Sequence, residues 1–213
     1  MIALTVLRLA ALVSGSGSNL QSIINAIATG SLDAKIVRVV ASRAGIKAEQ
    51  RALQYNLPYT LIQRRQYMDN SDLFCDSIAA ELEPLDIDLI LLCGFLSFLS
   101  EKFVKTYEGR IMNIHPSLLP AFGGKGAYGM HVHKAVLAYG VKISGCSVMF
   151  VDNGEDTGPI ILQRTVPVLD DDTPDTLAAR VMQQEDIAYP EAVRLFAEGR
   201  LSIVNRKVLI RKD

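Results

Sequence analysis

The sequence contains few of the residues that mark disulfide-rich or metal-binding proteins. Its 213 residues include three cysteines, three histidines and no tryptophan. The cysteines are odd in number and not spaced for a metal, which favours reduced thiols in a cytoplasmic protein over a disulfide framework. They are Cys75, Cys93 and Cys146. We therefore predict no metal site and a cytoplasmic location.

An excess of positive charge is also absent. Lys and Arg total 22, Asp and Glu total 23, and the formal net charge is -1. A protein that grips nucleic acid mainly through phosphates is expected to be clearly basic, so we expect no nucleic-acid partner. No apolar run reaches the roughly 18 residues of a membrane span, so we expect no membrane partner. The apolar residues 1–13 lack the basic start and the cleavage site of a signal peptide, and they predict a buried first strand.

The pattern of apolar residues predicts an α/β fold. Short apolar runs alternate with stretches of helical spacing over the first half of the chain, which is typical of a mostly parallel, doubly wound, Rossmann-like sheet. In the second half, predicted strands follow one another, which indicates added antiparallel strands. The predicted strands are residues 4–13, 36–41, 59–62, 87–92, 110–114, 143–151, 159–168, 201–204 and 207–210. The predicted helices are residues 19–28, 47–56, 72–83, 100–107, 131–139 and 173–197.

The length and the lack of a linker or repeat predict one domain. We expect it to span residues 1–213, with an N-terminal, phosphate-binding half of about 1–100 and a C-terminal half of about 101–213.

A glycine-rich turn, SGSGSN at residues 14–19, follows the first predicted strand and opens the first helix. Glycines let backbone N–H groups at a helix N-terminus approach an anion closely, so the turn predicts a phosphate cradle. Leu20 breaks the spacing of a dinucleotide site, and the lysine of a nucleotide P-loop is missing, which favours a single phosphomonoester. An ordinary tight turn capped by serine is the alternative.

One of the histidines stands in a setting that suits catalysis. Asn113 and His115 lie on the same side of an extended backbone, and Pro116 restricts His115 to that conformation. An amide donor can stabilise an oxyanion while an imidazole moves a proton, so the pair favours acyl transfer. A core histidine satisfied by backbone is the alternative. His131 and His133 lie two apart on a predicted helix and do not share a face, so they predict no metal pair, although one could line a substrate loop.

Two acidic residues are further candidates. Asp156, in a turn between two predicted strands, could face His115 and stabilise its protonated form, although turn formers alone also explain this segment. Glu185 lies within the apolar stripe of the long C-terminal helix and could bind hydroxyls or an amine of a ligand. A solvent-exposed charge is the alternative for Glu185.

Five stretches of the sequence, taken in order, carry a family resemblance. They are SGSGSNLQ at 14–21, CGFLSFLS at 93–100, GRIMNIHPSLLPAF at 109–122, GCSVMFVDNGEDTGPIILQ at 145–163 and AARVMQQEDIAYP at 178–190. On these residues the chain resembles the glycinamide ribonucleotide formyltransferases, which belong to the folate-dependent formyltransferase superfamily and act in purine biosynthesis. The resemblance spans nearly the whole chain, and NIHPSLLP with a downstream D-x-G-P-I is specific to the superfamily.

The resemblance implies a reaction and the residues that carry it out. A formyl group would pass from the co-substrate 10-formyltetrahydrofolate to the amine of 5′-phosphoribosylglycinamide, giving N-formylglycinamide ribonucleotide and tetrahydrofolate. By this resemblance Asn113 would hold the oxyanion, His115 would act as general acid and base, and Asp156 would support the charge on His115.

The resemblance also implies the binding residues. Gly17, Ser18 and Asn19 match the turn that binds the substrate phosphate, and Glu185 matches the residue that holds the ribonucleotide. The residues that match the folate site are Leu96, Ser97, Phe98, Leu99, Asp152, Asn153, Gly154 and Glu155. Small molecules are therefore the expected partners, and the choice between a monomer and a homodimer stays open.

The sequence departs from some members of the family. Met149 stands in place of a histidine, Ser97 in place of an arginine, and Met182 in place of a substrate-binding glutamine. An arginine that contacts folate in some members has no clear counterpart, and Arg64 and Arg65 are nearby candidates. Two alternatives to the transferase stay open. One is a sister enzyme such as formyltetrahydrofolate hydrolase, whose N-terminal regulatory domain would find no room here, and the other is a folate- or nucleotide-binding protein without catalysis.

Overall fold

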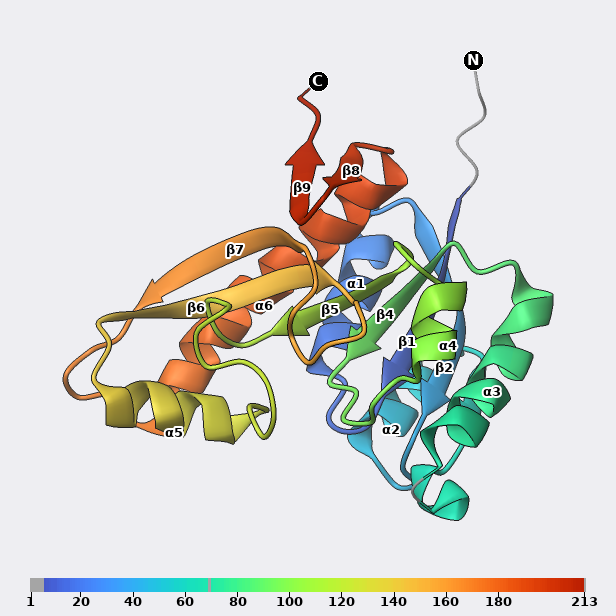
Figure 1. The fold of residues 1–213 in the computed structure, drawn as a ribbon, viewed down its shortest axis with the longest axis horizontal. Helices are drawn as coiled ribbons and strands as arrows, with labels where there is room; N and C mark the ends of the chain where they lie inside the picture. The colour runs from blue at the N-terminus through green and yellow to red at the C-terminus, as the bar shows by residue number, and fades with distance from the viewer. Residues whose placement is uncertain (1–5, 69, 213) are drawn as a thin grey trace. The chain divides into compact units, whose positions relative to one another are not determined.

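The computed structural model describes residues 6–68 and 70–212. The chain divides into two compact units, Met1–Met112 and Asn113–Asp213. The strand β5 (Ile111–His115) begins in the first unit and ends in the second. Figure 1 shows the first unit in blue to green and the second in green to red.

The first unit is built on parallel strands. They are β1 (Leu7–Val13), β2 (Ala34–Ala41), β3 (Tyr59–Leu61) and β4 (Leu89–Cys93). They lie in the order β3-β2-β1-β4, with parallel pairing at each step. All five residues of β4 are buried, as are six of the seven in β1. These strands read as almost uninterrupted apolar runs because helices cover both faces of a parallel sheet.

Helices of the first unit pack in two pairs. α1 (Ser18–Ala28) contacts α2 (Lys47–Gln54), and α3 (Ser71–Leu82) contacts α4 (Glu101–Thr106). The chain moves outward from β1 to β3 and then crosses back to β4 on the other side of β1. Right-handed crossovers therefore place α1 and α2 on one face and α3 on the other. The reversal between β1 and β4 is the point at which ligands bind in open α/β sheets.

The second unit contains an antiparallel pair and one long helix. β6 (Ile143–Phe150) pairs antiparallel with β7 (Ile160–Pro167), and α6 (Pro174–Ala197) packs against both strands and against α5 (Met130–Tyr139). Thr173 caps α6 in a reciprocal capping box with Thr176. The chain closes in a separate hairpin of β8 (Leu201–Val204) and β9 (Lys207–Ile210), which lies beside β7 and ends at the C-terminal label in Figure 1.

The predicted elements are confirmed, with shifts at their ends. The closing hairpin has the predicted bounds, and the parallel first half and the antiparallel pair of the second half are both present. Residues 4 and 5 of the predicted first strand lie outside the described residues. Two 3₁₀ turns, η1 (Arg64–Tyr67) and η2 (Glu83–Leu85), were not predicted. Turns this short leave no periodic signal in a sequence.

The three cysteines are free and buried. Burial raises the pKa of the Cys93 and Cys75 thiols and, together with the charge of Glu185, raises the pKa of Cys146 to about 12. The thiols are therefore buried and favoured in the protonated form, while their redox state in the cell stays a prediction. None of the helices in the described part of the chain is long and apolar enough to cross a membrane.

Candidate active site

The glycine-rich turn leaves the N-terminus of α1 open. Gly17 is the N-cap residue with φ 68°, and no side chain caps the helix at this residue. A Cβ at Gly17 would lie 2.8 Å from the Cβ of Ala48 on α2, so both the backbone conformation and the packing require glycine. The predicted alternative of a serine-capped turn is therefore wrong. The first amides of α1 are available to an anion.

Asn19 adds a polar group to this turn. Its side chain is buried, at 8% exposure, and its Oδ1 has no hydrogen-bond partner among the residues that the structure describes. Buried polar atoms are rarely left without a partner, and those that are often mark a place for a ligand or water.

The segment after β4 lies beside the glycine-rich turn. The backbone N–H of Leu96 donates to the Ser14 Oγ at 2.9 Å, and the N–H of Ser100 donates to the Cys75 Sγ at 3.1 Å. Between these anchors the side chains of Leu96 and Phe98 are exposed, at 45% and 61%. The structure thus brings the segment with the predicted folate residues 96–99 next to the predicted phosphate turn.

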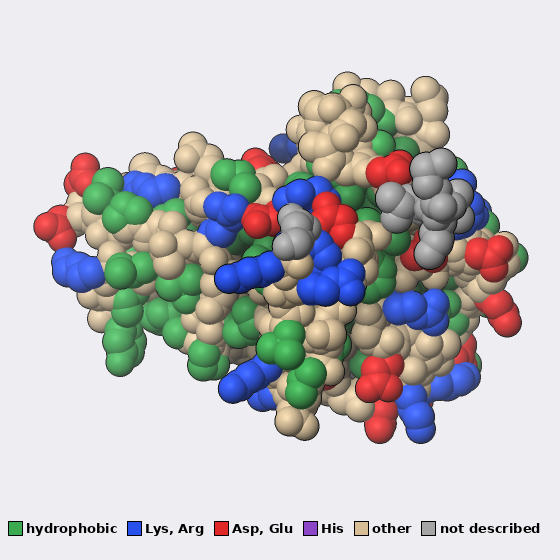
Figure 2. Space-filling model, turned by 90° about the horizontal axis from the view of Figure 1, so that it is seen from above, with side chains coloured by type: hydrophobic (Ala, Val, Ile, Leu, Met, Phe, Trp, Pro, Cys, Tyr) green, Lys and Arg blue, Asp and Glu red, His purple; other side chains and the backbone are tan. Residues whose placement is uncertain are grey.

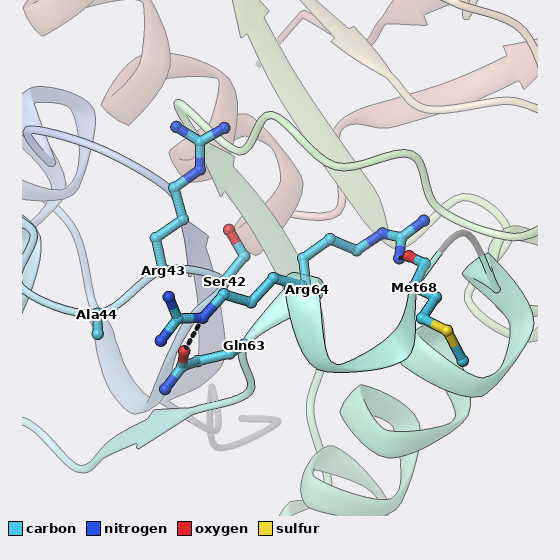
Figure 3. A pocket seen from close by; sticks show the side chains of 7 residues that line it. Ser42, Arg43, Ala44, Gln63, Arg64 and Met68 are labelled. Carbon is cyan, nitrogen blue, oxygen red and sulfur yellow. Dashed lines mark hydrogen bonds between the residues drawn. The ribbon is translucent and has the colours of Figure 1, made fainter.

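A pocket of about 550 Å³ opens past the ends of β2 and β3. Its lining consists of Ser42, Arg43, Ala44, Gln63, Arg64, Arg65 and Met68, and it contains no acidic residue. Figure 3 shows Arg64 reaching toward Met68, whose carbonyl accepts from its guanidinium, while Arg43 points away. Arg65 donates from Nε to the Gln63 Oε1 at 2.7 Å. Within the described residues, none of the three arginines forms an ion pair, so the pocket is cationic.

His115 ends β5 and is held by oxygen atoms at both ring nitrogens. Its Nε2 is 3.0 Å from the carbonyl oxygen of Phe122, and its Nδ1 is 3.4 Å from the Oδ2 of Asp156. The residue is only 4% exposed. Asn113 lies two residues earlier on the same strand and is half-buried. The structure therefore brings His115 and Asp156, two of the predicted catalytic residues, into contact.

Asp156 reaches His115 because the surrounding loops are tightly folded. Its backbone is left-handed, with φ 54°, and its Oδ2 also accepts from the N–H of Gly124 at 2.9 Å. A Cβ on Gly123 would lie 2.4 Å from Leu119 and 3.3 Å from the Cβ of Asp156. The glycine pair at 123–124 therefore permits the carboxylate to approach.

A polar network, buried at Ser117 and Ser147, fixes the chain that follows His115. The Ser147 Oγ accepts from the Leu119 N–H at 3.0 Å and donates to the Ser117 carbonyl at 2.7 Å. Gln163 donates to the Leu119 carbonyl at 3.0 Å and lies 2.9 Å from the same Ser147 Oγ. These contacts satisfy the loop's polar groups from β6 and β7, so the loop is anchored to regular structure.

The predicted folate loop of the second unit is closed on itself. Asp152 accepts from the Gly154 N–H at 3.0 Å and from the Thr157 hydroxyl at 2.6 Å. A Cβ on Gly158 would lie 1.8 Å from the Phe150 carbonyl oxygen, so the loop cannot close without this glycine. Asn153 and Gly154 are exposed at the tip, while Glu155, like Asp152, is half-buried.

Glu185 is buried on α6, at 7% exposure, so the alternative of a solvent-exposed charge is wrong. Its charge lies close enough to Cys146 to help raise the pKa of that thiol.

The sequence analysis did not predict that His133 is buried. It lies on α5 at 4% exposure, and its Nδ1 has no hydrogen-bond partner in the described part of the chain. Burial, and then the charge of His115, lower the pKa of His133 below 6.5. His131 is exposed and packs edge-on against Tyr128 at 5.0 Å.

Comparison with known proteins identifies the family. A model of the formyl transferase family matches residues 7–193. The solved structure of glycinamide ribonucleotide transformylase 1 from Symbiobacterium toebii matches with a TM-score of 0.91 and 38% identity, covering 97% of this chain and 94% of that one. This chain belongs to the formyl transferase family, among its phosphoribosylglycinamide formyltransferases. The predicted family and the predicted fold class are both confirmed.

Curated relatives of this family member include longer proteins. The chloroplastic phosphoribosylglycinamide formyltransferase of Vigna unguiculata is 42% identical over 194 residues, 91% of this chain. The trifunctional purine biosynthetic protein adenosine-3 of Gallus gallus is 41% identical over 196 residues, 92% of this chain. The chain spans 62% of the first and 19% of the second protein.

The depressed pKa of His133 predicts a pH-dependent stability. The charged form is disfavoured in the fold, so the unfolded chain binds more protons as pH falls below 6.5. The free energy of unfolding should fall as pH drops through 6.5, and the loss should be complete below the lowered pKa. Urea denaturation of the His133→Asn variant between pH 7.5 and 5 should give a shallower decline. The exposed His131→Asn variant should keep the wild-type slope, and equal slopes for the two variants would contradict the argument.

Proposed function

We propose that this chain transfers a formyl group from 10-formyltetrahydrofolate to the amine of 5′-phosphoribosylglycinamide, giving N-formylglycinamide ribonucleotide and tetrahydrofolate. The observation that carries the proposal is His115, buried in a chain of this family and held between the Phe122 carbonyl and the Asp156 carboxylate. The acceptor, the donor and the cytoplasmic location belong to the proposal, with small molecules as the only partners. The single domain 1–213 belongs to it as well, and the scheme uses no metal.

In this mechanism the substrate amine attacks the formyl carbon. A new C–N bond forms, the carbonyl oxygen becomes an oxyanion, and the Asn113 amide donates a hydrogen bond to it. His115 takes a proton from the attacking nitrogen at Nε2, where this contact replaces the one with the Phe122 carbonyl, and returns one to N10 of the folate as the C–N10 bond breaks. Asp156 stabilises the imidazolium that exists between these two steps, because the carboxylate lies 3.4 Å from Nδ1.

The proposed substrate-binding residues follow from their chemical groups and from the family resemblance. The open amides of Gly17, Ser18 and Asn19 would hold the phosphate, and the carboxylate of Glu185 would hold the ribonucleotide. The peptide groups of residues 96–99 and the loop 152–155 would contact the folate. Backbone groups suit the flat polar edge of a pterin, so Ser97 can replace an arginine in this segment.

The cationic pocket is the proposed place for the acidic tail of the folate. Arg64 lies over the Phe74 ring, 5.4 Å from its centroid, and Phe74 stacks on Phe95 at 6.2 Å, next to the folate segment. A tail that leaves this segment would meet the three arginines of the pocket. Guanidinium groups recognise carboxylates well because their geometries match.

The assay for the proposed activity compares turnover with and without the acceptor. The purified protein should convert 10-formyltetrahydrofolate to tetrahydrofolate only when 5′-phosphoribosylglycinamide is present, because the amine is the nucleophile. Absorbance at the folate chromophore follows the conversion. Equal turnover without acceptor would identify a hydrolase, and binding without turnover would identify a non-catalytic folate protein.

Removing the proposed acid–base group should lower the rate strongly. His115→Ala should reduce kcat by roughly 100-fold or more, since positioned proton transfer contributes on that order. Asp156→Asn should reduce it by roughly 10- to 100-fold, because the amide cannot stabilise the imidazolium. Asp170→Asn, at a carboxylate that is 93% exposed, is the matched control and should leave kcat unchanged. A near-wild-type rate in either test variant would remove that residue from the mechanism.

Neutralising the pocket should weaken binding of the donor alone. The double variant Arg43→Gln/Arg65→Gln should raise KM for 10-formyltetrahydrofolate roughly three- to tenfold, since it removes two exposed ion pairs that contribute roughly 0.2–1 kcal/mol each. KM for the acceptor should not change. Lys35→Gln, at an exposed residue near the opposite end of β2, is the control. An unchanged donor KM in the double variant would place the tail elsewhere.

A further inference from the structure

Two buried serines meet where three strands of the first unit end level with one another. Val13 pairs with Ala41 of β2 and with Cys93 of β4, so the residues that follow these strand ends are brought together. Ser14 and Ser42 are each 3% exposed, and their Oγ atoms lie 2.6 Å apart. Strand register places Ser14 at the reversal between β1 and β4, with Ser42 beside it at the end of β2.

The Ser14 hydroxyl also holds the segment after β4. It accepts the Leu96 N–H at 2.9 Å, although the two residues are 82 positions apart. A hydroxyl has one proton and two lone pairs, so Ser14 can accept from Leu96 and still share a hydrogen bond with Ser42. The segment is therefore fixed at one end by Ser14 and at the other by Cys75.

A different side chain holds the glycine-rich turn. The Arg51 Nε donates to the Ser16 carbonyl at 3.0 Å, and its Nη1 donates to the Gln21 Oε1 at 2.6 Å. Arg51 thereby ties the turn and the first part of α1 to α2. The glycine-rich turn is thus anchored by Arg51, and the neighbouring segment after β4 is anchored by Ser14.

We propose that Ser14 is a positioning residue for the formyl donor, which holds the peptide groups of residues 96–99 in the geometry that receives the pterin. Arg51 performs the corresponding task for the phosphate turn and hence for the acceptor. This inference rests on the proposed function, because it assigns the two anchors to that function's two substrates. Neither side chain needs to touch a substrate.

Loss of either anchor should raise KM, but for a different substrate in each case. Ser14→Ala removes the acceptor of the Leu96 N–H, so KM for 10-formyltetrahydrofolate should rise roughly five- to tenfold while KM for 5′-phosphoribosylglycinamide stays within about twofold. Arg51→Gln should raise the acceptor KM by a similar factor and leave the donor KM unchanged. A general loss of stability would not produce this crossed pattern.

Two further serine variants keep the test decisive. Ser14→Cys keeps a weaker acceptor for the Leu96 N–H and should raise the donor KM above the wild-type value but less than Ser14→Ala does, and it replaces that variant if Ser14→Ala fails to fold. Ser144→Ala removes an equally buried hydroxyl, at 3% exposure, whose oxygen has no hydrogen-bond partner among the described residues, and should change neither KM.

Calorimetric titration of each variant with 10-formyltetrahydrofolate alone separates the two hypotheses. Weaker donor binding in this titration of Ser14→Ala, together with an unchanged KM for the acceptor, supports the positioning role. If the wild type binds the donor but transfers nothing to the acceptor, the proposed function fails while the donor titrations still test Ser14. Donor affinity in Ser14→Ala equal to wild type, or an equal rise for both substrates, would overturn the inference.

Discussion

The first unit depends on the parallel pairing of β1 with β2 on one side and β4 on the other. This pairing brings the ends of three strands to one level and places the turn after β1 beside the segment after β4. Parallel strands all point the same way, so the loops that leave their carboxyl ends gather at one edge. The glycine-rich turn, residues 96–99 and the cationic pocket all lie along that edge, although their residues are distant in sequence.

In the second unit, the corresponding constraint is the close approach of two loops to one histidine. Gly124 supplies an N–H to Asp156, and Phe122 supplies a carbonyl to His115. The imidazole is thus held at both ring nitrogens by groups from two different loops. The sequence contains nearly equal numbers of basic and acidic residues, 22 and 23. On the face shown in Figure 2, acidic and basic side chains are interspersed, so recognition of an anion depends on local groups.

The sequence predicts the features of the fold and of the candidate site that depend on neighbouring residues. It does not predict those that depend on contacts between distant residues. The glycine-rich turn and the closing hairpin were predictable because conformation there depends on local residues, such as Asn205 with φ 55°. The burial of His133 was not, because α5 has only a weak apolar periodicity. The contact between Ser14 and Leu96 depends on strand pairing across 82 positions. The approach of Asp156 to His115 depends on loop conformations that no sequence period records.

The three buried thiols of the folded chain are expected to react only slowly with alkylating reagents. A thiol reacts with alkylating reagents as its thiolate, and burial both blocks access and raises the pKa of each cysteine here. Cys75 and Cys93 lie in the first unit and Cys146 in the second. Labelling of each thiol therefore reports the opening of its own unit, and the native sequence carries an unfolding sensor for each half without any engineered probe.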